Sequence, residues 1–597
     1  MPEVGLTSAP VRLPARFIAA PRLPEAGVRL ALIGFVTLVA LVLILGPIGA
    51  ILLKSLQNAT GELVGLANFR AYASNPALAR SIGNSLLLGG LTTTITMLLA
   101  FPYAYALTRS CLPGKFVFGG IALLPILAPS LLPAIALTYL FGNQGFLKSW
   151  LSGGSIYGLP GIVAGQVFYC FPHAFLILST ALALADARLY EAAETLGASR
   201  ARMFRTITVP AARFGIVGAT FVVFTIAVTD FGVAKVIGGQ FNVLSIDIYK
   251  QVIGQQNFQM GAVVGVILLV PSLLSFAVDL YVRRRQRSLL SARSVVLKPT
   301  PSRAFDLAML TVVAIIGGLI LALVATALFA SFVKFWPYDL SLTFGNYDFA
   351  AYDAAGWSSY ANSLKMAALT ALAGTLLAFS GAYLVEKGRG HAWLGSLYRA
   401  VAVLPLAVPG LALGLGYIFF FNAPGNPLNG VYGGLSILVM ATVAHYYTVP
   451  HLMAVTALKQ LDGEIEEAGA SLGVPFWTTF FRVTLPICVP TVIDIATYFF
   501  LNAMTTIGAV VFLYAPATKL ASVAVVEMDD TGDTAAAAAM AIMVLVTAAG
   551  VKLVQFALTT VAVSRTQAWR RPSAAPEPEG TKVPSISAAL APARRPS

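Results

Sequence analysis

Charged residues are scarce in this chain. Asp, Glu, Lys and Arg make up 11% of its 597 residues, while 58% of the residues are hydrophobic. A soluble domain carries about 25% charged residues, and the mean hydropathy here is +0.81. Too few polar residues are present to cover a water-soluble surface. We therefore predict an all-α polytopic membrane protein, with the lipid bilayer as the solvent of most of the chain.

Cysteine and histidine are also rare. The chain has three cysteines and four histidines. They are Cys111, Cys170, Cys488, His173, His391, His445 and His451. Their spacing fits neither a disulfide framework nor a metal-binding motif. We expect structural roles for them, with no metal site, no catalytic residues and no cofactor.

A phosphate-binding loop is missing as well. The string nearest to a Walker A motif runs from Gly142 to Ser149, but it has no glycine directly before Lys148. The chain should therefore not hydrolyse ATP itself. A membrane-embedded enzyme would need a cluster of His, Glu or Ser side chains near one face, and the sequence has no such pattern.

Long apolar runs are what the sequence has in abundance. Twelve segments can each supply the roughly 20 residues that cross a bilayer. They are 30–53, 84–107, 117–141, 160–184, 213–234, 259–282, 306–332, 361–384, 395–421, 434–457, 488–514 and 537–562. Some contain prolines, such as Pro125, Pro129, Pro405 and Pro409. Such breaks are tolerated where neighbouring helices or a cavity satisfy the backbone.

The net charge of +14 is explained by where the basic residues fall. They precede the first span, follow the last, and gather in alternate loops between the others. This is the positive-inside pattern of membrane proteins, so both termini should be cytoplasmic and the charge need not indicate nucleic acid. We expect a multi-pass membrane protein.

Two short polar stretches are copies of one another. We name residues 190–210 the first island and residues 466–486 the second island. Seven residues of the first return 276 positions later in the second. They are Glu191, Ala192, Leu196, Gly197, Phe204, Thr208 and Pro210, which return as Glu467, Ala468, Leu472, Gly473, Phe480, Thr484 and Pro486. A polar loop kept twice at one spacing suggests two docking points outside the membrane.

The repetition extends beyond the islands. Asn84-Ser85-Leu86 recurs as Asn362-Ser363-Leu364, and Leu124-Pro125 recurs as Leu404-Pro405. This predicts about 12 transmembrane helices arranged as two homologous six-helix halves. The expected parts are a disordered cytoplasmic tail (1–28), a first six-helix half (29–282), a basic cytoplasmic linker (283–304), a second six-helix half (305–565) and a disordered cytoplasmic tail (566–597).

The first island predicts a helix–turn–helix. Its first helix should start near Asp186, where an acidic residue suits the positive end of the helix dipole. Gly197 is then placed where a left-handed residue would end that helix. A second short helix should run to Pro210 and break there.

The islands resemble the Glu-Ala-Ala loop of ABC importer permeases, the inner-membrane components of binding-protein-dependent transport systems. Glu191-Ala192-Ala193 with Gly197 matches the pattern, whereas Glu467-Ala468 is followed by Gly469. The resemblance implies that each loop docks on one of two cytoplasmic ATPase subunits. It implies that Glu191 and Glu467 orient the loops, that Gly197 and Gly473 permit their turns, and that a periplasmic binding protein delivers the solute.

Fused two-half permeases of this size serve several solutes. Three stretches, 229–232, 247–258 and 526–533, resemble permeases for 2-aminoethylphosphonate. That likeness implies a small polar solute of this kind, with ferric iron or a polyamine as alternatives. A secondary transporter is the rival interpretation. It predicts coupling charges inside the membrane and no repeated docking loop.

Ionisable and amide side chains inside apolar segments are candidates for a transport pathway. Asp230 lies in the fifth segment, and its repeat counterpart is Thr506. Asp494 and Asn502 lie eight residues apart in the eleventh, which predicts that both face one side. The alternative is that Asp230 ends a helix and Asp494 pairs locally.

Overall fold

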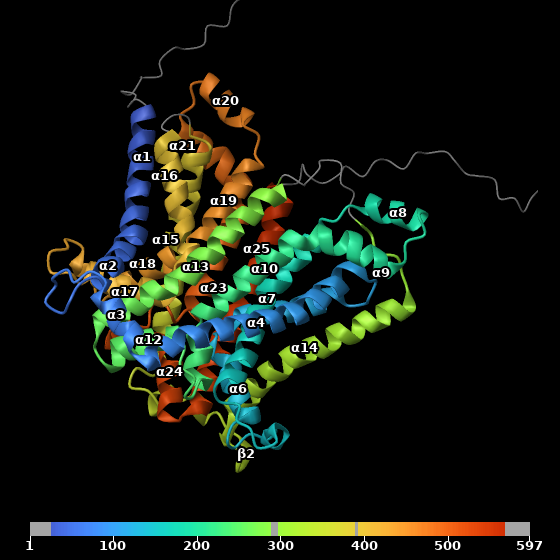
Figure 1. Cartoon of the computed structure of the whole chain (residues 1–597). Coiled ribbons are helices and arrows are strands. Elements are labelled where there is room, and N and C mark those ends of the chain that lie inside the picture. Colours follow the sequence, from blue (N-terminus) through green and yellow to red (C-terminus); the bar gives the residue numbers. More distant parts are fainter. Residues whose placement is uncertain (1–24, 288–296, 389–391, 567–597) are drawn as a thin grey trace, which may run out of the picture.

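The computed structural model describes residues 25–287, 297–388 and 392–566 of the chain. Most of the expected tails (1–24 and 567–597) and the central part of the linker (288–296) lie outside these residues. Most of the described chain is helical (Figure 1), as the composition predicts for a protein that must satisfy its backbone hydrogen bonds in lipid.

The first half contains thirteen α-helices. They are α1 (Glu25–Ala40), α2 (Gly46–Ser55), α3 (Ala67–Ser74), α4 (Pro76–Arg109), α5 (Lys115–Leu123), α6 (Leu131–Phe141), α7 (Leu159–Ala183), α8 (Ala187–Thr195), α9 (Arg200–Met203), α10 (Val209–Thr229), α11 (Gly232–Ile237), α12 (Leu244–Tyr249) and α13 (Phe258–Arg287).

Among the described residues, the second half contains twelve α-helices. They are α14 (Arg303–Phe332), α15 (Trp357–Glu386), α16 (Ala392–Val403), α17 (Gly410–Phe421), α18 (Leu435–Tyr446), α19 (Thr448–Lys459), α20 (Glu464–Ser471), α21 (Phe476–Thr479), α22 (Leu485–Ile487), α23 (Val489–Thr505), α24 (Ala521–Thr531) and α25 (Thr534–Thr566). Strands β1 (Val333–Phe335) and β2 (Asp339–Leu342) form a small antiparallel hairpin.

Among the described residues, eight helices are long and apolar enough to cross a membrane. Four further pairs of helices pass the same test together, although each pair is bent by more than 40°. The number of spans reaches twelve when each bent pair is taken as one span. The expected number of segments is therefore present, and four of them are broken.

Prolines explain two of these breaks. Residues Leu124–Leu127 (η2) and Leu404–Ala407 (η8) form 3₁₀ turns that contain Pro125 and Pro405. The residue before the next proline is extended in each case, because the proline ring excludes the helical conformation there. The helices on either side diverge by 100° in the first half and by 118° in the second.

Equivalent hydrogen bonds are formed within each of the two halves. Ser85 Oγ accepts from the backbone N–H of Leu244 at 2.8 Å, and its counterpart Ser363 accepts from Ala521 at 2.8 Å. In the same way, Ser245 Oγ donates to the carbonyl of Asp230, and Ser522 Oγ donates to that of Thr506. Equivalent side chains thus hold equivalent segments in both halves.

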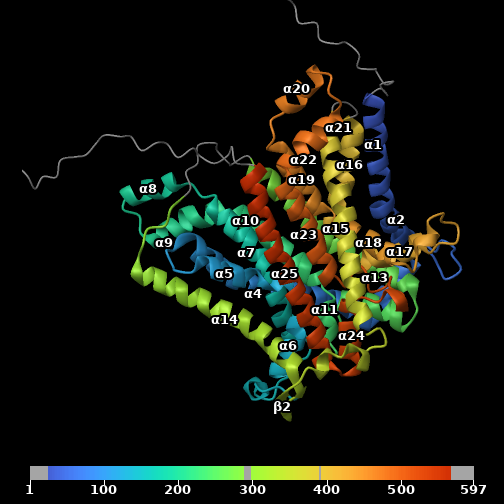
Figure 2. The same ribbon diagram turned by 180° about the vertical axis from the view of Figure 1, so that it is seen from behind.

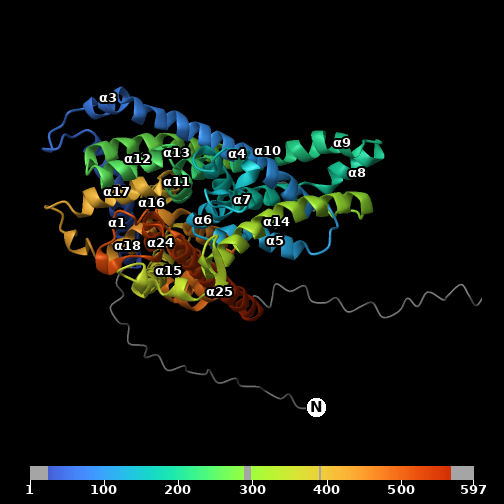
Figure 3. The same ribbon diagram turned by 90° about the horizontal axis from the view of Figure 1, so that it is seen from below.

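The first helix of each half packs against the other half. We call α1–α2 and α14 the leading helices. α2 packs on α17, and Tyr417 donates to the carbonyl of Leu43 at 2.9 Å across this contact. α14 packs on α4, α5 and α6, and Asp306 accepts from the backbone N–H of Cys111 at 2.8 Å. Figures 2 and 3 show α1 beside α16 and α14 beside α5. The halves are therefore interlocked.

Candidate functional site

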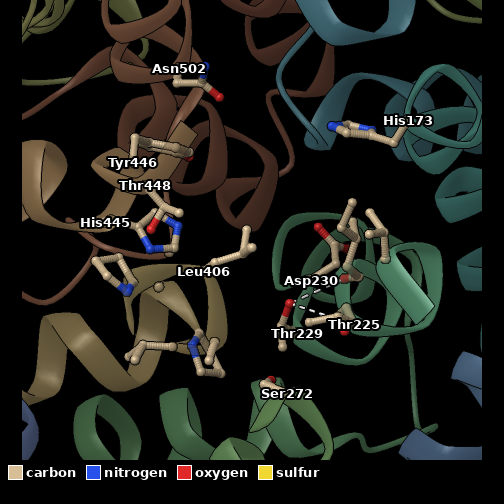
Figure 4. Close-up of a pocket in the computed structure, with 18 of the residues that line it drawn as sticks. His173, Thr225, Thr229, Asp230, Ser272, Leu406, His445, Tyr446, Thr448 and Asn502 are labelled. Carbon is tan, nitrogen blue, oxygen red and sulfur yellow. Dashed lines mark hydrogen bonds between the residues drawn. The ribbon is translucent and has the colours of Figure 1, made fainter. Parts of the chain in front are cut away.

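A cavity of about 410 Å³ lies between the two halves. The first half contributes α7, α10 and α13 to its wall, and the second contributes η8, α18, α19 and α23. Figure 4 shows His173, Thr225, Thr229 and Asp230 facing Leu406, His445, Tyr446 and Asn502 across it. Both halves therefore build one shared site.

The polar lining contains hydroxyl, imidazole, amide and carboxylate groups but neither lysine nor arginine. Its polar residues are Ser130, Tyr169, His173, Thr225, Thr229, Asp230, Ser272, Ser275, His445, Tyr446, Thr448, Tyr498, Asn502, Thr505 and Thr506. Asp230 contributes the one carboxylate of this lining, and neither lysine nor arginine belongs to it. The cavity wall therefore has acidic or neutral character.

Asp230 combines a structural and a surface position. Helix α10 ends at Thr229, and the Asp230 carboxylate accepts from the backbone N–H of Val233 at 3.1 Å at the start of α11. Its side chain still belongs to the cavity wall although the residue is only 9% exposed. Asp230 therefore follows the end of a helix and also belongs to the cavity wall, and its place in a transport pathway stays a prediction.

Asn502 also lines the cavity, whereas Asp494 does not belong to the lining. Asp494 instead accepts a hydrogen bond from Gln555 on α25. The expectation that both face one side is wrong for this cavity. Eight residues exceed two helical turns, which leaves the two side chains about 80° apart around the axis.

Phe231 of the cavity wall continues into contacts between the two halves that were not predicted from the sequence. The Phe231 and Tyr249 rings lie 5.1 Å apart, and Tyr249 lies 6.3 Å from Phe512 of the second half. Lys235 on α11 forms an ion pair with Asp530 on α24 at 2.9 Å. Figure 2 shows these helices at the end away from α8 and α20. No sequence motif surrounds Lys235 or Asp530, so their ion pair is recognised only in the tertiary structure.

The islands lie at the opposite end and have the predicted turn. Asp186 begins α8 by accepting from the backbone N–H of Arg188 at 3.1 Å. Gly197 follows the helix with φ of 71°, and Gly473 follows α20 with φ of 67°. In both islands the backbone N–H groups of this glycine and of the residue after it donate to carbonyl groups in the last turn of the helix. Such a left-handed ending favours glycine.

The islands expose the same positions to their surroundings. Glu191, Ala192, Glu467 and Ala468 are all exposed. Leu196 beside the first turn is 85% exposed, and Leu472 beside the second is 80% exposed. Both islands therefore expose a leucine at the equivalent position of the turn.

The expected break at Pro210 is absent. Residues Arg200–Thr229 form one 30-residue helix, with a π-helical segment, Phe204–Thr208 (η4), before the proline. The second island has the same segment at Phe480–Thr484 (η10) before Pro486. A wider π turn accommodates the missing N–H and the ring, so the proline need not end the helix. In the second half the bend of 78° comes after Ile487, beyond Pro486.

These features together define a class. The chain is a polytopic helical membrane protein whose two related halves enclose one cavity, with a pair of exposed loops at one end. This is the architecture of a membrane permease.

Comparison with known proteins identifies the family. The model described as "Binding-protein-dependent transport system inner membrane component" matches residues 113–288 and again residues 372–560. The chain therefore belongs to this family, whose members are permease subunits of ABC transporters. The double match confirms the prediction of two homologous halves.

Two similar proteins extend over most of the chain. The ferric transport system permease protein FbpB of Actinobacillus pleuropneumoniae is 28% identical over 79% of this chain and 69% of its own length. The putative ferric transport system permease protein FbpB 1 of Haemophilus influenzae is 28% identical over 74% of this chain and 71% of its own length.

The particular likeness to 2-aminoethylphosphonate permeases is not supported. The putative 2-aminoethylphosphonate transport system permease protein PhnU of Salmonella typhimurium is 24% identical over only 40% of this chain. Short shared stretches such as 526–533 are weak guides to the solute, because permeases of one family share local sequence whatever they carry.

Proposed function

We propose that this chain is the transmembrane subunit of an ATP-driven importer for a cationic solute, with ferric iron as the first candidate. Two cytoplasmic ATPase subunits would dock on the islands. A periplasmic binding protein would deliver the solute at the opposite end of the molecule. Both termini would then lie in the cytoplasm, and the chain would carry no ATPase site of its own.

The charge of the cavity wall is the observation that carries the solute class. Asp230 supplies a carboxylate, and Lys and Arg are missing from the lining. A phosphonate would face this carboxylate without a basic partner, and an unpaired charge in a site of low polarity is costly. A cation would be attracted by the same carboxylate. The names of the two FbpB relatives are consistent with that choice.

The donor atoms of the wall also suit a hard cation in transit. The phenol oxygens of Tyr169, Tyr446 and Tyr498 line the cavity together with Asp230, and oxygen donors suit hard cations. Among the described residues, no group of three His, Cys, Asp or Glu side chains could hold a metal ion. Such a wall would bind a cation weakly. Weak binding favours passage, because a solute that is held tightly does not leave.

The islands support the docking of partner subunits. Each presents a helix, a glycine turn and an exposed leucine, Leu196 or Leu472, at the same end of the molecule. The nearby basic residues Arg188, Arg200 and Arg202 support a cytoplasmic location for that end.

The test is transport by the complete complex. The tagged chain is purified from its native membranes together with the proteins bound to it, and the complex is reconstituted in vesicles. The vesicles are supplied with ATP and with the periplasmic binding protein, which is loaded with either ⁵⁵Fe(III) or radiolabelled 2-aminoethylphosphonate. We expect ATP-dependent uptake of iron alone. Uptake of the phosphonate alone would overturn the cation proposal, and uptake of iron without any co-purified ATPase would overturn the importer proposal.

A conservative variant tests the role of the carboxylate. Asp230→Asn keeps the size of the side chain and an oxygen that can accept from Val233, but it removes the charge. We expect roughly a tenfold fall in iron uptake, the effect of losing about 1.4 kcal/mol of favourable interaction. Asp494→Asn on α23 is the matched control, since Asp494 lies outside the cavity lining and can keep its bond to Gln555 as an asparagine. Equal uptake by the two variants would contradict the role of Asp230.

A further inference from the structure

Each island is contacted by the leading helix of the opposite half through an arginine and a phenylalanine. The guanidinium carbon of Arg29 on α1 lies 4.7 Å from the ring centre of Phe476 in the second island. The guanidinium carbon of Arg200 in the first island lies 5.8 Å from the ring centre of Phe305 on α14. Both distances are within the range of a cation–π interaction.

The two pairs are the same contact with its partners exchanged. Phe305 follows Arg29 by 276 residues, and Phe476 follows Arg200 by 276 residues, which is the offset that relates the islands. In the second half of the molecule the island supplies the ring and the opposite leading helix supplies the cation. In the first half the island supplies the cation and the leading helix supplies the ring.

A second bond accompanies each pair. The Phe476 backbone N–H donates to the carboxylate of Glu25 at 3.0 Å, and Glu25 also lies 3.6 Å from Arg29. In the first island, Arg200 donates to the hydroxyl of Ser302 at 3.3 Å, just before α14 begins. Both islands are therefore attached at two points to a helix of the other half.

The leading helices connect these attachment points to the far end of the molecule. Glu25–Ser55 extends over 31 residues and Arg303–Phe332 over 30 residues. α2 packs on α17 and α14 on α6, so each helix follows the opposite half for much of its length. A rigid helix that is fixed to an island at one end transmits a displacement of that island along its whole length.

We propose that Arg29 and Phe305 are positioning residues that couple each island to the leading helix of the opposite half. The inference rests on the proposed function, because it assumes that ATPase subunits move the islands. Movement of either island then displaces a helix that belongs to the other half. When the two ATPase subunits close on each other, their movement consequently acts on both halves together rather than on each half alone.

The Arg29–Phe476 pair of the second island gives the sharper test, because Phe476 is buried and only 8% exposed. Phe476→Leu keeps an apolar side chain and removes the ring, whereas Phe476→Trp keeps a ring. In the complete complex we expect Phe476→Leu to lower solute transported per ATP hydrolysed two- to tenfold, a factor that matches the strength of one cation–π contact. Phe476→Trp should stay near the wild-type ratio.

Exchange of the partners provides a rescue. Arg29→Phe and Phe476→Arg should each lower the transport-to-ATP ratio, and the double variant should recover at least half of the loss. Arg200→Phe with Phe305→Arg repeats the comparison in the first island. Arg303→Phe is the control for an Arg→Phe change at an exposed position of a leading helix.

Thermal unfolding of each purified variant separates coupling from folding, since a role in folding alone would lower stability and leave the ratio unchanged. A wild-type ratio for Phe476→Leu would overturn the inference. So would double variants that are no better than the worse single variant in both islands. If no ATPase co-purifies with the wild-type chain, the proposed function itself fails, a result that the variants are not needed to detect.

Discussion

Lys235 Nζ lies 2.9 Å from Asp530 Oδ1 and joins α11 of the first half to α24 of the second. The same ammonium group lies 5.2 Å from the ring centre of Tyr249. The contact is at the end of the molecule away from the islands, next to the aromatic cluster of Phe231, Tyr249 and Phe512. At this end of the molecule the two halves are thus joined by an ion pair and a group of aromatic rings.

Asp529, next to this ion pair and outside the candidate spans, makes the contact sensitive to pH. Burial first, and then the charge of Asp530, raise the pKa of Asp529 to about 7, although Lys235 opposes the shift. A raised pKa stabilises the folded state at low pH and loses this stabilisation as pH rises from about 4 through 7. We expect the Tm of the purified chain to fall over this interval, through an effect of a few kcal/mol at about 1.4 kcal/mol per pKa unit.

The measurement is thermal unfolding of the wild-type chain and of Asp529→Asn from pH 5 to 8. The variant should lose most of the slope, because an asparagine does not ionise. Asp533→Asn, in the turn that follows α24, serves as the control and should keep it. An unchanged slope in Asp529→Asn would show that other groups cause the pH dependence.

The packing of a leading helix on the opposite half depends on a glycine. A Cβ atom on Gly416 of α17 would lie 2.4 Å from the carbonyl oxygen of Pro47 on α2. We expect Gly416→Ala to separate these helices and to destabilise the chain by about 1–3 kcal/mol, the usual cost of overpacking.

Gly49 on α2 provides the matched comparison, since nothing lies within 4 Å of its Cβ position. Gly49→Ala should be neutral or stabilise the helix by up to about 1 kcal/mol. Thermal or denaturant unfolding of both variants checks the pair. Equal stability would mean that α2 and α17 are not held at this distance.

The turns of the islands depend on backbone conformation and not on space. A Cβ atom on Gly197 or Gly473 would meet nothing within 4 Å, but φ is positive at both. Substitution by valine should cost about 1–2 kcal/mol in each turn, whereas asparagine tolerates this conformation. We expect Gly197→Val with Gly473→Val to lower the amount of ATPase that co-purifies by at least threefold, and the matching asparagine variant to retain it.

An equal yield of ATPase from the valine and asparagine variants would show that the turns do not determine docking. Thermal unfolding of the chain alone controls for folding. Since both islands are exposed, the turns themselves should contribute little to the stability of the remainder.

A buried lysine organises the loop before α24. Lys519 lies 2.6 Å from Asp353 and also contacts Glu527, which accepts from the hydroxyl of Tyr514 at 2.9 Å. Lys519→Met would leave the buried carboxylate of Asp353 without its partner, which typically costs about 3–5 kcal/mol.

The double variant Lys519→Met with Asp353→Asn should recover more than half of that loss, because it no longer buries an uncompensated charge. Unfolding experiments on the single and double variants provide the comparison. Absence of any recovery would mean that Glu527, and not Asp353, is the partner that matters for stability.

Local sequence was sufficient for the spans, the paired halves and the turns at Gly197 and Gly473. Each of these depends on composition, repetition or the conformational preference of one residue type. The continuity of the helix through Pro210 was not predictable in this way, because a π turn relieves a restriction that proline normally imposes.

Contacts between segments that are distant in the chain could not be predicted from the sequence. Hydropathy locates α1 and α14 as spans but does not show that each lies on the opposite half. Likewise, Arg29 and Phe476 have no special surroundings in the sequence, and their significance appears only when their distance is compared with that between Arg200 and Phe305. The position of Asp494 beside Gln555 depends on helix rotation, which residue spacing gives only to within tens of degrees.

The interlocked leading helices also bear on how the chain is made. α14 meets its binding surface on α4, α5 and α6 as soon as it is synthesised, because those helices are already in place. α1–α2 is synthesised well before α15, α16 and α17, on which it packs and which follow more than 300 residues later. This leading helix therefore waits for its binding surface, and its packing is completed only after much of the second half has been translated.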